Sequence, residues 1–173
     1  AAPPANCACP GNLVNNPSFE SGTGGWNWWN GTLYSDTYAA QCGANSGQFL
    51  HNNTWGVYGG AYQDITGITP NSVIAVEVYA GVHTNQYDAY VGVEFINSSG
   101  GWISGEYHQV DAPLPNMALY SFPSVTVPAG TSKVRLIFGN DWDWVKTDQW
   151  CLTVTCSNVT SGGTIGSNQS ACG

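Results

Sequence analysis

Ile74-Ala-Val-Glu-Val-Tyr-Ala-Gly-Val-His83 is a stretch whose apolar residues recur at every second position, and the fold class follows from it. Side chains of a β-strand point alternately to its two faces, so this stretch presents one aliphatic face and one mixed face. Residues 90–96 repeat the pattern, with Val91, Val93 and Phe95 predicted inside. No window of a dozen residues holds an apolar repeat of 3.6, so long helices are not expected.

Further short runs rich in Val, Ile, Tyr and Phe lie between turn signals along the chain. They predict an all-β fold, a two-sheet antiparallel β-sandwich of the jelly-roll kind. Asn30-Gly31 is a strong hairpin signal, and residues 97–101 predict a second hairpin loop. Pro123, inside the run 119–127, indicates an edge strand or a bulge. The last strand is expected at 150–155.

The charge of the chain excludes several classes of partner. Three basic residues stand against eleven acidic ones, for a formal net charge of −8. Neutralising phosphates requires clustered Lys and Arg, so nucleic acid is excluded as a partner, and so is attraction to anionic lipid. No apolar run approaches the roughly 20 residues of a membrane span. Strongly anionic glycans would be repelled, whereas neutral ones would not.

Six cysteines and a polar composition with few Lys predict a secreted or cell-surface protein with disulfides. Sequence alone cannot choose among the fifteen possible pairings of six cysteines. We expect a Cys/Pro-rich lead-in at 1–11, a β-sandwich module at 12–156, and a Gly/Ser/Thr-rich linker to a further domain at 157–173. The module itself is expected to be monomeric.

The opening stretch Asn12-Leu-Val-Asn-Asn-Pro-Ser-Phe-Glu20 reads as a short apolar strand followed by a turn at Pro17. It places the Glu20 carboxylate beside an apolar anchor, Phe19. A carboxylate on such a turn, with main-chain carbonyls nearby, suits a hard cation that binds oxygens. An exposed acid on a simple turn is the alternative interpretation.

Four motifs occur in an order that resembles the calcium-containing jelly-roll carbohydrate-binding modules of families 4, 16 and 22. They are NLVNNPSFESG followed by a Trp, TWGVYGGAYQDITGITP, VPAGTSKVRLIF and TDQWCLTV. Together they run from about Asn12 to Thr155. The polar tail, in addition, resembles the spacers between modules in large surface proteins of gliding and related environmental bacteria.

The resemblance implies a structural Ca²⁺ that ties the first strand to the last. Carried over position by position, its ligands would be Glu20, Asp148 and oxygens at Ser18, Asn45 and Ser46. The chain departs from the family at Gln149, where a second Asp is usual. Because such a site forms only in the folded chain, metal binding would appear as folding stability.

Eight Trp and nine Tyr are more than a core of this size can hold. We expect Trp26 and Trp150 inside, and part of the remainder exposed for stacking on sugar rings. Three groups compete for this role, and they are Trp55, Tyr58, Trp142 and Trp144 on loops; Glu77, Tyr79, His83, Tyr90 and Glu94 on an outward sheet face; and Trp28, Trp29 and Tyr34. Arg135 is expected to pair with Glu77 or Glu94.

These observations predict a non-catalytic module that binds a neutral polysaccharide or oligosaccharide through aromatic stacking and through hydrogen bonds of amides and carboxylates. A structural or adhesive module without glycan binding is the alternative. Carboxylates for glycoside hydrolysis could in principle come from Glu77, Glu94, Glu106, Asp141 and Asp143. The three histidines form no recognisable Ser/His/Asp arrangement, so we expect no enzyme.

Overall fold

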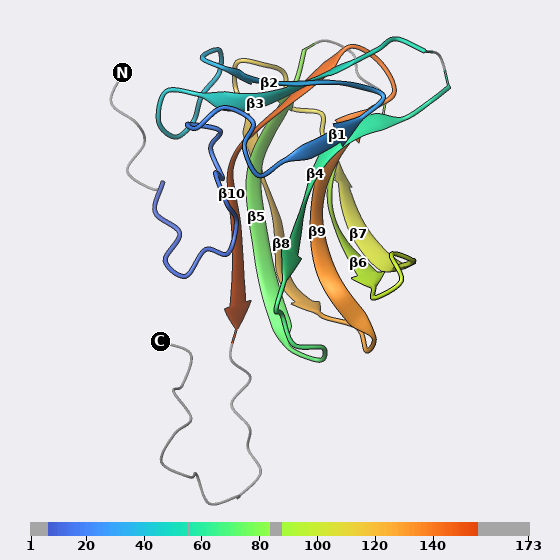
Figure 1. Cartoon of the computed structure of the whole chain (residues 1–173). Coiled ribbons are helices and arrows are strands. Elements are labelled where there is room, and N and C mark those ends of the chain that lie inside the picture. The colour runs from blue at the N-terminus through green and yellow to red at the C-terminus, as the bar shows by residue number, and fades with distance from the viewer. Residues whose placement is uncertain (1–6, 55, 84–87, 156–173) are drawn as a thin grey trace, which may run out of the picture.

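The computed structural model describes residues 7–54, 56–83 and 88–155, and these form two stacked antiparallel sheets of five strands each (Figure 1). The first sheet has the order β1 (Asn27–Trp29), β4 (Gly59–Thr66), β9 (Thr131–Asn140), β6 (Tyr90–Asn97) and β7 (Trp102–Gln109). The second has the order β2 (Gly31–Asp36), β3 (Ser46–His51), β10 (Trp144–Thr155), β5 (Val73–Val82) and β8 (Ala118–Thr126). The predicted all-β sandwich is confirmed.

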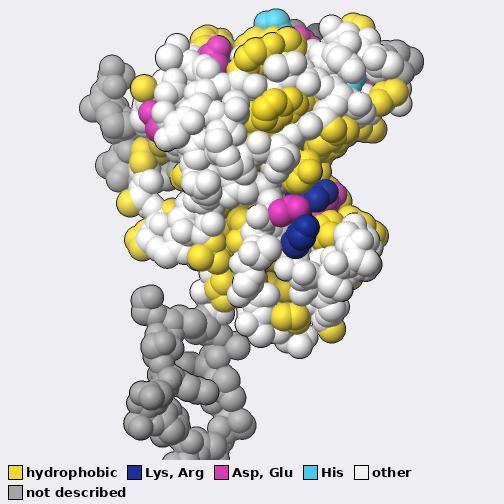
Figure 2. All heavy atoms as spheres, viewed as in Figure 1, with side chains coloured by type: hydrophobic (Ala, Val, Ile, Leu, Met, Phe, Trp, Pro, Cys, Tyr) yellow, Lys and Arg dark blue, Asp and Glu magenta, His cyan; other side chains and the backbone are white. Residues whose placement is uncertain are grey.

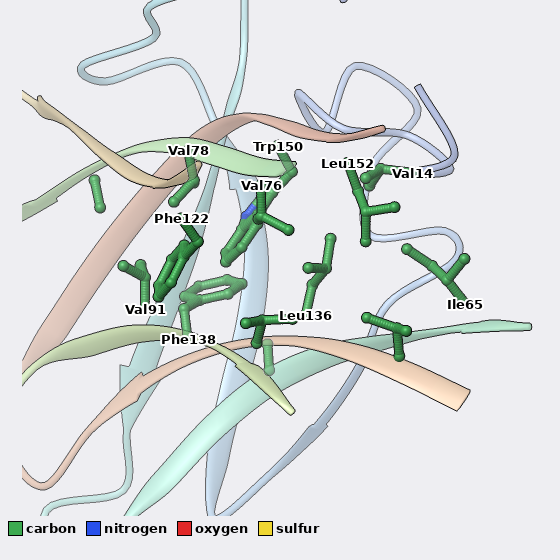
Figure 3. Close-up of a cluster of buried hydrophobic side chains, with 14 of the residues drawn as sticks. Val14, Ile65, Val76, Val78, Val91, Phe122, Leu136, Phe138, Trp150 and Leu152 are labelled. Atoms are coloured by element: carbon green, nitrogen blue, oxygen red, sulfur yellow. The ribbon is translucent and has the colours of Figure 1, made fainter. Parts of the chain in front are cut away.

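The core lies between the two sheets and consists of the aliphatic faces that alternation predicts. Ile74, Val76 and Val78 of β5 are fully buried, and the predicted inward residues of β6 are buried with them. Figure 3 shows side chains of the second sheet pointing toward side chains of the first, with Val76, Val78, Phe122 and Trp150 facing Val91, Leu136 and Phe138. Each buried side chain of this size contributes about 1.5–3 kcal/mol.

The opening stretch docks on β10 at the edge of this core. Asn12 donates its amide to the carbonyl of Trp150 at 2.9 Å and accepts the N–H of Leu152 at 3.0 Å. Phe19 stacks on Trp26 with ring centroids 5.1 Å apart, and Trp26 and Trp150 are both inside, as predicted. The resulting contact joins the start of the module to its last strand.

Two disulfides fix the lead-in to the same region. Cys7 pairs with Cys42, and Cys9 pairs with Cys151 of β10. Cys156 and Cys172, like the predicted linker at 157–173, lie outside the described residues. The domain boundaries therefore stay a prediction.

Three local predictions have different outcomes. The hairpin at Asn30-Gly31 is wrong, because the chain crosses there from one sheet to the other: β1 pairs with β4, whereas β2 pairs with β3. Pro123 lies in the edge strand β8, next to a register shift against β5, so that prediction is confirmed. The last strand is longer than expected and begins at Trp144. Within the described residues there is no helix that could cross a membrane.

Candidate functional site

The predicted ligand residues divide between the outer faces of two different sheets. Tyr90 and Glu94 lie on β6 in the first sheet, whereas Glu77 and Tyr79 lie on β5 in the second. The prediction that these residues share one sheet face is therefore wrong. Alternation assigns each side chain to the inside or the outside of the sandwich, but it does not tell which sheet a strand joins.

Register defines four rows of side chains across the outer face of the first sheet, which we call the aromatic face. The first row is Trp29, Gly60, Gly139 and Tyr90. The second is Tyr62, Ile137, Gly92 and Tyr107. The third is Asp64, Arg135, Glu94 and Gly105. The fourth is Thr66, Lys133, Ile96 and Trp102.

In Figure 2 a band of yellow side chains ends at a hollow on the right, where dark blue and magenta side chains meet.

Glycines leave room for rings to lie across this face. A Cβ atom on Gly60 would come 2.7 Å from the Trp29 ring, and one on Gly92 would overlap the Tyr107 ring. These rings therefore occupy the space that a side chain would take. Tyr107 is 47% exposed and Trp102 is 60% exposed. Such flat apolar surfaces suit the C–H faces of sugar rings.

Charged pairs are placed between the rings. Arg135 lies over the Tyr62 ring, 4.0 Å from its centroid, and donates from Nε and Nη2 to the two oxygens of Asp64 at 2.7 and 3.1 Å. The prediction that Arg135 pairs with Glu77 or Glu94 is thus wrong. The hydrogen bonds to Asp64 raise the pKa of the Arg135 guanidinium. Because two donor atoms are fixed on one carboxylate, the guanidinium plane is held in place.

Glu94 has a different partner. The hydroxyl of Tyr107 donates to Glu94 Oε1 at 2.7 Å, and Trp102 bonds to the same hydroxyl. Burial, followed by this bond to Glu94, raises the pKa of Tyr107 to about 12. Burial likewise raises the pKa of Tyr90 well above its usual range. Both phenols therefore keep their protons near neutral pH, so they serve as hydrogen-bonding groups rather than as bases.

Loop residues continue the aromatic face at one end. Tyr58 lies against Tyr90, with ring centroids 6.1 Å apart. Burial, together with the nearby charges of Asp88 and Asp141, raises the pKa of Tyr58. Trp142, which follows Asp141, is 44% exposed. Trp55 lies outside the described residues, and exposed Trp28 points away from the Trp29 side of β1.

The outer face of the second sheet holds the remaining predicted residues. His83 stacks on Trp144 at 4.5 Å, and its Nδ1 lies 2.8 Å from an oxygen of Asp143. Tyr79 and Glu77 line a cavity of about 120 Å³, next to the lead-in. That space holds about four waters and is smaller than a typical ligand pocket. The aromatic face is therefore the stronger candidate.

The predicted calcium ligands all lie around the loop 37–45, which joins β2 to β3. Glu20 Oε1 accepts the N–H groups of Ala44 and Asn45 at 2.9 and 2.8 Å. Asp148 is buried, and its Oδ2 accepts the N–H groups of Gln41 and Cys42 at 2.6 and 2.8 Å.

Side-chain hydroxyls complete this arrangement. Ser18 bonds to Asp148, and the hydroxyl of Ser46 lies 3.2 Å from Lys146 Nζ. The described residues contain no group of three His, Cys, Asp or Glu side chains that could hold a metal. An ion would therefore have two carboxylates and main-chain oxygens as ligands. A carboxylate has about four lone-pair sites. Glu20 Oε2 keeps lone pairs for an ion, but Asp148 accepts bonds from Gln41, Cys42, Gln149 and Ser18, so Ca²⁺ would have to replace one of these.

Known proteins add evidence on the fold. No protein-family model matches the chain, and no curated protein matches it. A family 16 carbohydrate-binding module is 15% identical, with a TM-score of 0.65, over 82% of this chain and 99% of that one. A family 22 module, from the C-terminal part of Clostridium thermocellum Xyn10B, is 16% identical, with a TM-score of 0.64, over 88% and 96%. The fold is that of these carbohydrate-binding modules.

The same fold also occurs within larger enzymes. The enzymatically active domain of bacteriophage CBA120 tailspike protein 4 is 15% identical, with a TM-score of 0.67. The match covers 84% of this chain but only 22% of that one. Identities of this size establish a shared fold and no more, so the function has to be argued from the aromatic face.

Five residues of the aromatic face were not singled out as ligand-binding from the sequence, and they are Tyr62, Asp64, Trp102, Tyr107 and Lys133. On the face, each of these residues has neighbours in the adjacent strands that are far from it in the sequence. Tyr62 and Tyr107, for example, share a row although 45 positions separate them. Only Tyr107 has a sequence signal that could have indicated it, which is the glycine under its ring at Gly92, and the other four residues have none.

Proposed function

We propose that the chain is a non-catalytic carbohydrate-binding module that docks a secreted or cell-surface protein on a polysaccharide through the aromatic face. One observation carries the proposal: rings that lie over glycines alternate with hydrogen-bonding pairs on a single hollowed sheet face. Sugar rings would stack on Trp102, Tyr107 and Trp29. Their hydroxyls would bond to the free lone pairs of Glu94 and Asp64.

The pairing of the polar groups favours binding over catalysis. A glycosidase needs one carboxylic acid that keeps its proton and one free carboxylate. Here Glu94 accepts a bond from Tyr107, and Asp64 is held by Arg135. Of the other carboxylates weighed for hydrolysis, Glu77 belongs to the opposite sheet and Asp143 lies 2.8 Å from His83. We therefore propose a binding role, with a neutral polysaccharide backbone as the ligand because the chain as a whole is acidic.

A glycan array followed by calorimetry on the glycans that bind tests this proposal. Tyr107→Ala should weaken binding about tenfold, which corresponds to about 1.4 kcal/mol, because a stacking ring and the partner of Glu94 are both lost. Tyr34→Ala is the matched control, since it removes a similarly exposed tyrosine from the second sheet. Loss of binding only in Tyr34→Ala would move the site to the other sheet. Silence across a wide array would support a structural or adhesive module instead.

The calcium ion remains a separate part of the proposal. Glu20 and Asp148 would hold it with main-chain oxygens near Ser18 and Asn45, and its charge would offset the two carboxylates at the junction of the opening stretch, β10 and the loop 37–45. Hydrogen bonds and a disulfide already hold this loop. We therefore expect the ion to add stability rather than to be required for folding.

A further inference from the structure

The chain has only three Lys and Arg side chains, and their positions are uneven. Lys146 is fully buried in the second sheet. The other two, Lys133 and Arg135, both lie on β9 and both point to the aromatic face, in its third and fourth rows. Every solvent-accessible Lys or Arg of a protein with a net charge of −8 is thus found in the proposed glycan site.

These two cations keep unused donors. Arg135 engages Asp64 through Nε and Nη2, which leaves the N–H groups of Nη1 and one of Nη2. The ammonium of Lys133 is 3.8 Å from Asp64, beyond hydrogen-bond range, and no described residue hydrogen-bonds it. Its side chain is 41% exposed. A ligand could therefore bind both groups without breaking the Arg135–Asp64 pair.

Local charge at this point differs from that of the whole molecule. Lys133 and Arg135 face Asp64 and Glu94, so two positive and two negative groups cancel. Beyond the Debye length of about 8 Å at physiological salt, other acids are largely screened. In its own row Lys133 has Thr66 and Ile96 as neighbours, and Glu94 is its diagonal neighbour on β6, at the roughly 7–8 Å typical of such pairs.

We infer that the Lys133–Arg135 end of the aromatic face binds a carboxylate on the glycan, so that the ligand is a neutral backbone bearing isolated uronic acid substituents. This inference rests on the proposed function and specifies its ligand class. A continuous polyanion is not the ligand, because it would also meet Asp88 and Asp141 near the Tyr58 end. A single carboxylate at the Lys133 end meets charge-assisted donors instead.

The test uses matched pairs of oligosaccharides on an array and in calorimetry: neutral backbones, among them xylo-oligosaccharides, each with and without one glucuronic acid branch. We expect the branched member of at least one pair to bind about tenfold more tightly at low salt. The preference should shrink as salt rises, and polygalacturonate should bind weakly. Lys133→Gln should abolish the preference while neutral binding persists, and Lys133→Arg should retain it.

A charge-relocated control excludes a general effect of net charge. Lys133→Gln combined with Thr126→Lys keeps the net charge but moves the cation to β8 of the other sheet, and this double variant should behave like Lys133→Gln alone.

Equal binding of all matched pairs would overturn the inference and leave the proposed function intact. So would a preference that survives Lys133→Gln. Failure of every glycan to bind would overturn both.

Discussion

Gly92 shows how one missing side chain shapes the aromatic face. The Tyr107 ring fills the space above it, and a Cβ at this position would overlap that ring. Gly92→Ala should displace Tyr107, break its bond to Glu94 and weaken glycan binding by roughly tenfold, about 1.4 kcal/mol. Calorimetry on the variant measures this. Gly24→Ala is the control, because its added Cβ meets nothing closer than 3.6 Å, and equal affinities of the two variants would contradict the assignment.

Asp148 is the residue whose titration should be visible in stability. Burial is the main cause that raises its pKa from 3.8 to about 6, against the opposing effect of the amides that bond to it. The folded state therefore binds the proton more tightly than the unfolded state. The resulting stabilisation, roughly 3 kcal/mol, is complete below about pH 4 and is lost as pH rises through about 6.

Urea unfolding between pH 4 and 7.5 in the presence of chelator measures this effect. Asp148→Asn has no carboxyl group at this position, so the difference in unfolding free energy between wild type and variant should change steadily between about pH 4 and 6 and level off above pH 6. A difference that stays constant over the whole range would show that the Asp148 carboxyl keeps its ordinary pKa in the folded chain.

Calcium should act in the opposite direction at the same carboxylate, because a bound cation favours the ionised form. At pH 7.5 an ion at 100 times its dissociation constant would stabilise the fold by about 2.7 kcal/mol. Thermal unfolding with calcium and with chelator measures this, and Glu20→Gln should reduce the shift. An unchanged midpoint in wild type would remove calcium from the account.

At the scale of elements, the loop 37–45 is held to β10 and to the opening stretch by side chains whose charges match its main-chain groups. Lys146 Nζ donates to Asp36 Oδ1 and to the carbonyl of Tyr38, both at 2.7 Å. Burial lowers the pKa of Lys146, although the bond to Asp36 opposes this. Asp148 and Glu20 accept N–H groups farther along the same loop. The loop is thus fixed by main-chain contacts at three points.

Lys146→Met should therefore destabilise the fold by about 2–4 kcal/mol, since the carbonyl of Tyr38 and the hydroxyl of Ser46 lose their buried donor. Asp36→Asn keeps an oxygen acceptor at a partly exposed position, so this variant should lose less folding stability than Lys146→Met does. Equal stability of Lys146→Met and wild type in urea unfolding would contradict this. It would show that packing of the side chain at position 146 against Tyr38 and Trp144 is enough to keep the fold stable.

The strands themselves could be predicted from alternation, but their partners could not. Val76, Val78, Val91 and Val93 are inside as expected, because a period of two fixes the inward side of any strand. The hairpin predicted at Asn30-Gly31 was wrong because a turn sequence indicates that the chain reverses direction, but it does not determine whether the next strand joins the same sheet. For the same reason, residues of β5 and β6 were predicted to share one sheet face, although the two strands belong to different sheets.

At the scale of the whole molecule, the sandwich class was predictable and most of the candidate site was not. Tyr58, Tyr90 and Glu94 were singled out because they are ring and carboxylate positions predicted on loops or on the outward side of a strand. The pairing of Arg135 with Asp64, and of Tyr107 with Glu94, depends on cross-strand register among four strands. Register follows from packing across both sheets, and no local sequence pattern carries it.

Residue-resolved NMR during titration with a glycan from the array tests the central claim most directly, because it reports which face is contacted. The account predicts shifts concentrated at Tyr62, Gly92 and Tyr107 on the first sheet, with Tyr79 and Trp144 on the second sheet unchanged. Shifts confined to Tyr79, His83 and Trp144 would contradict it.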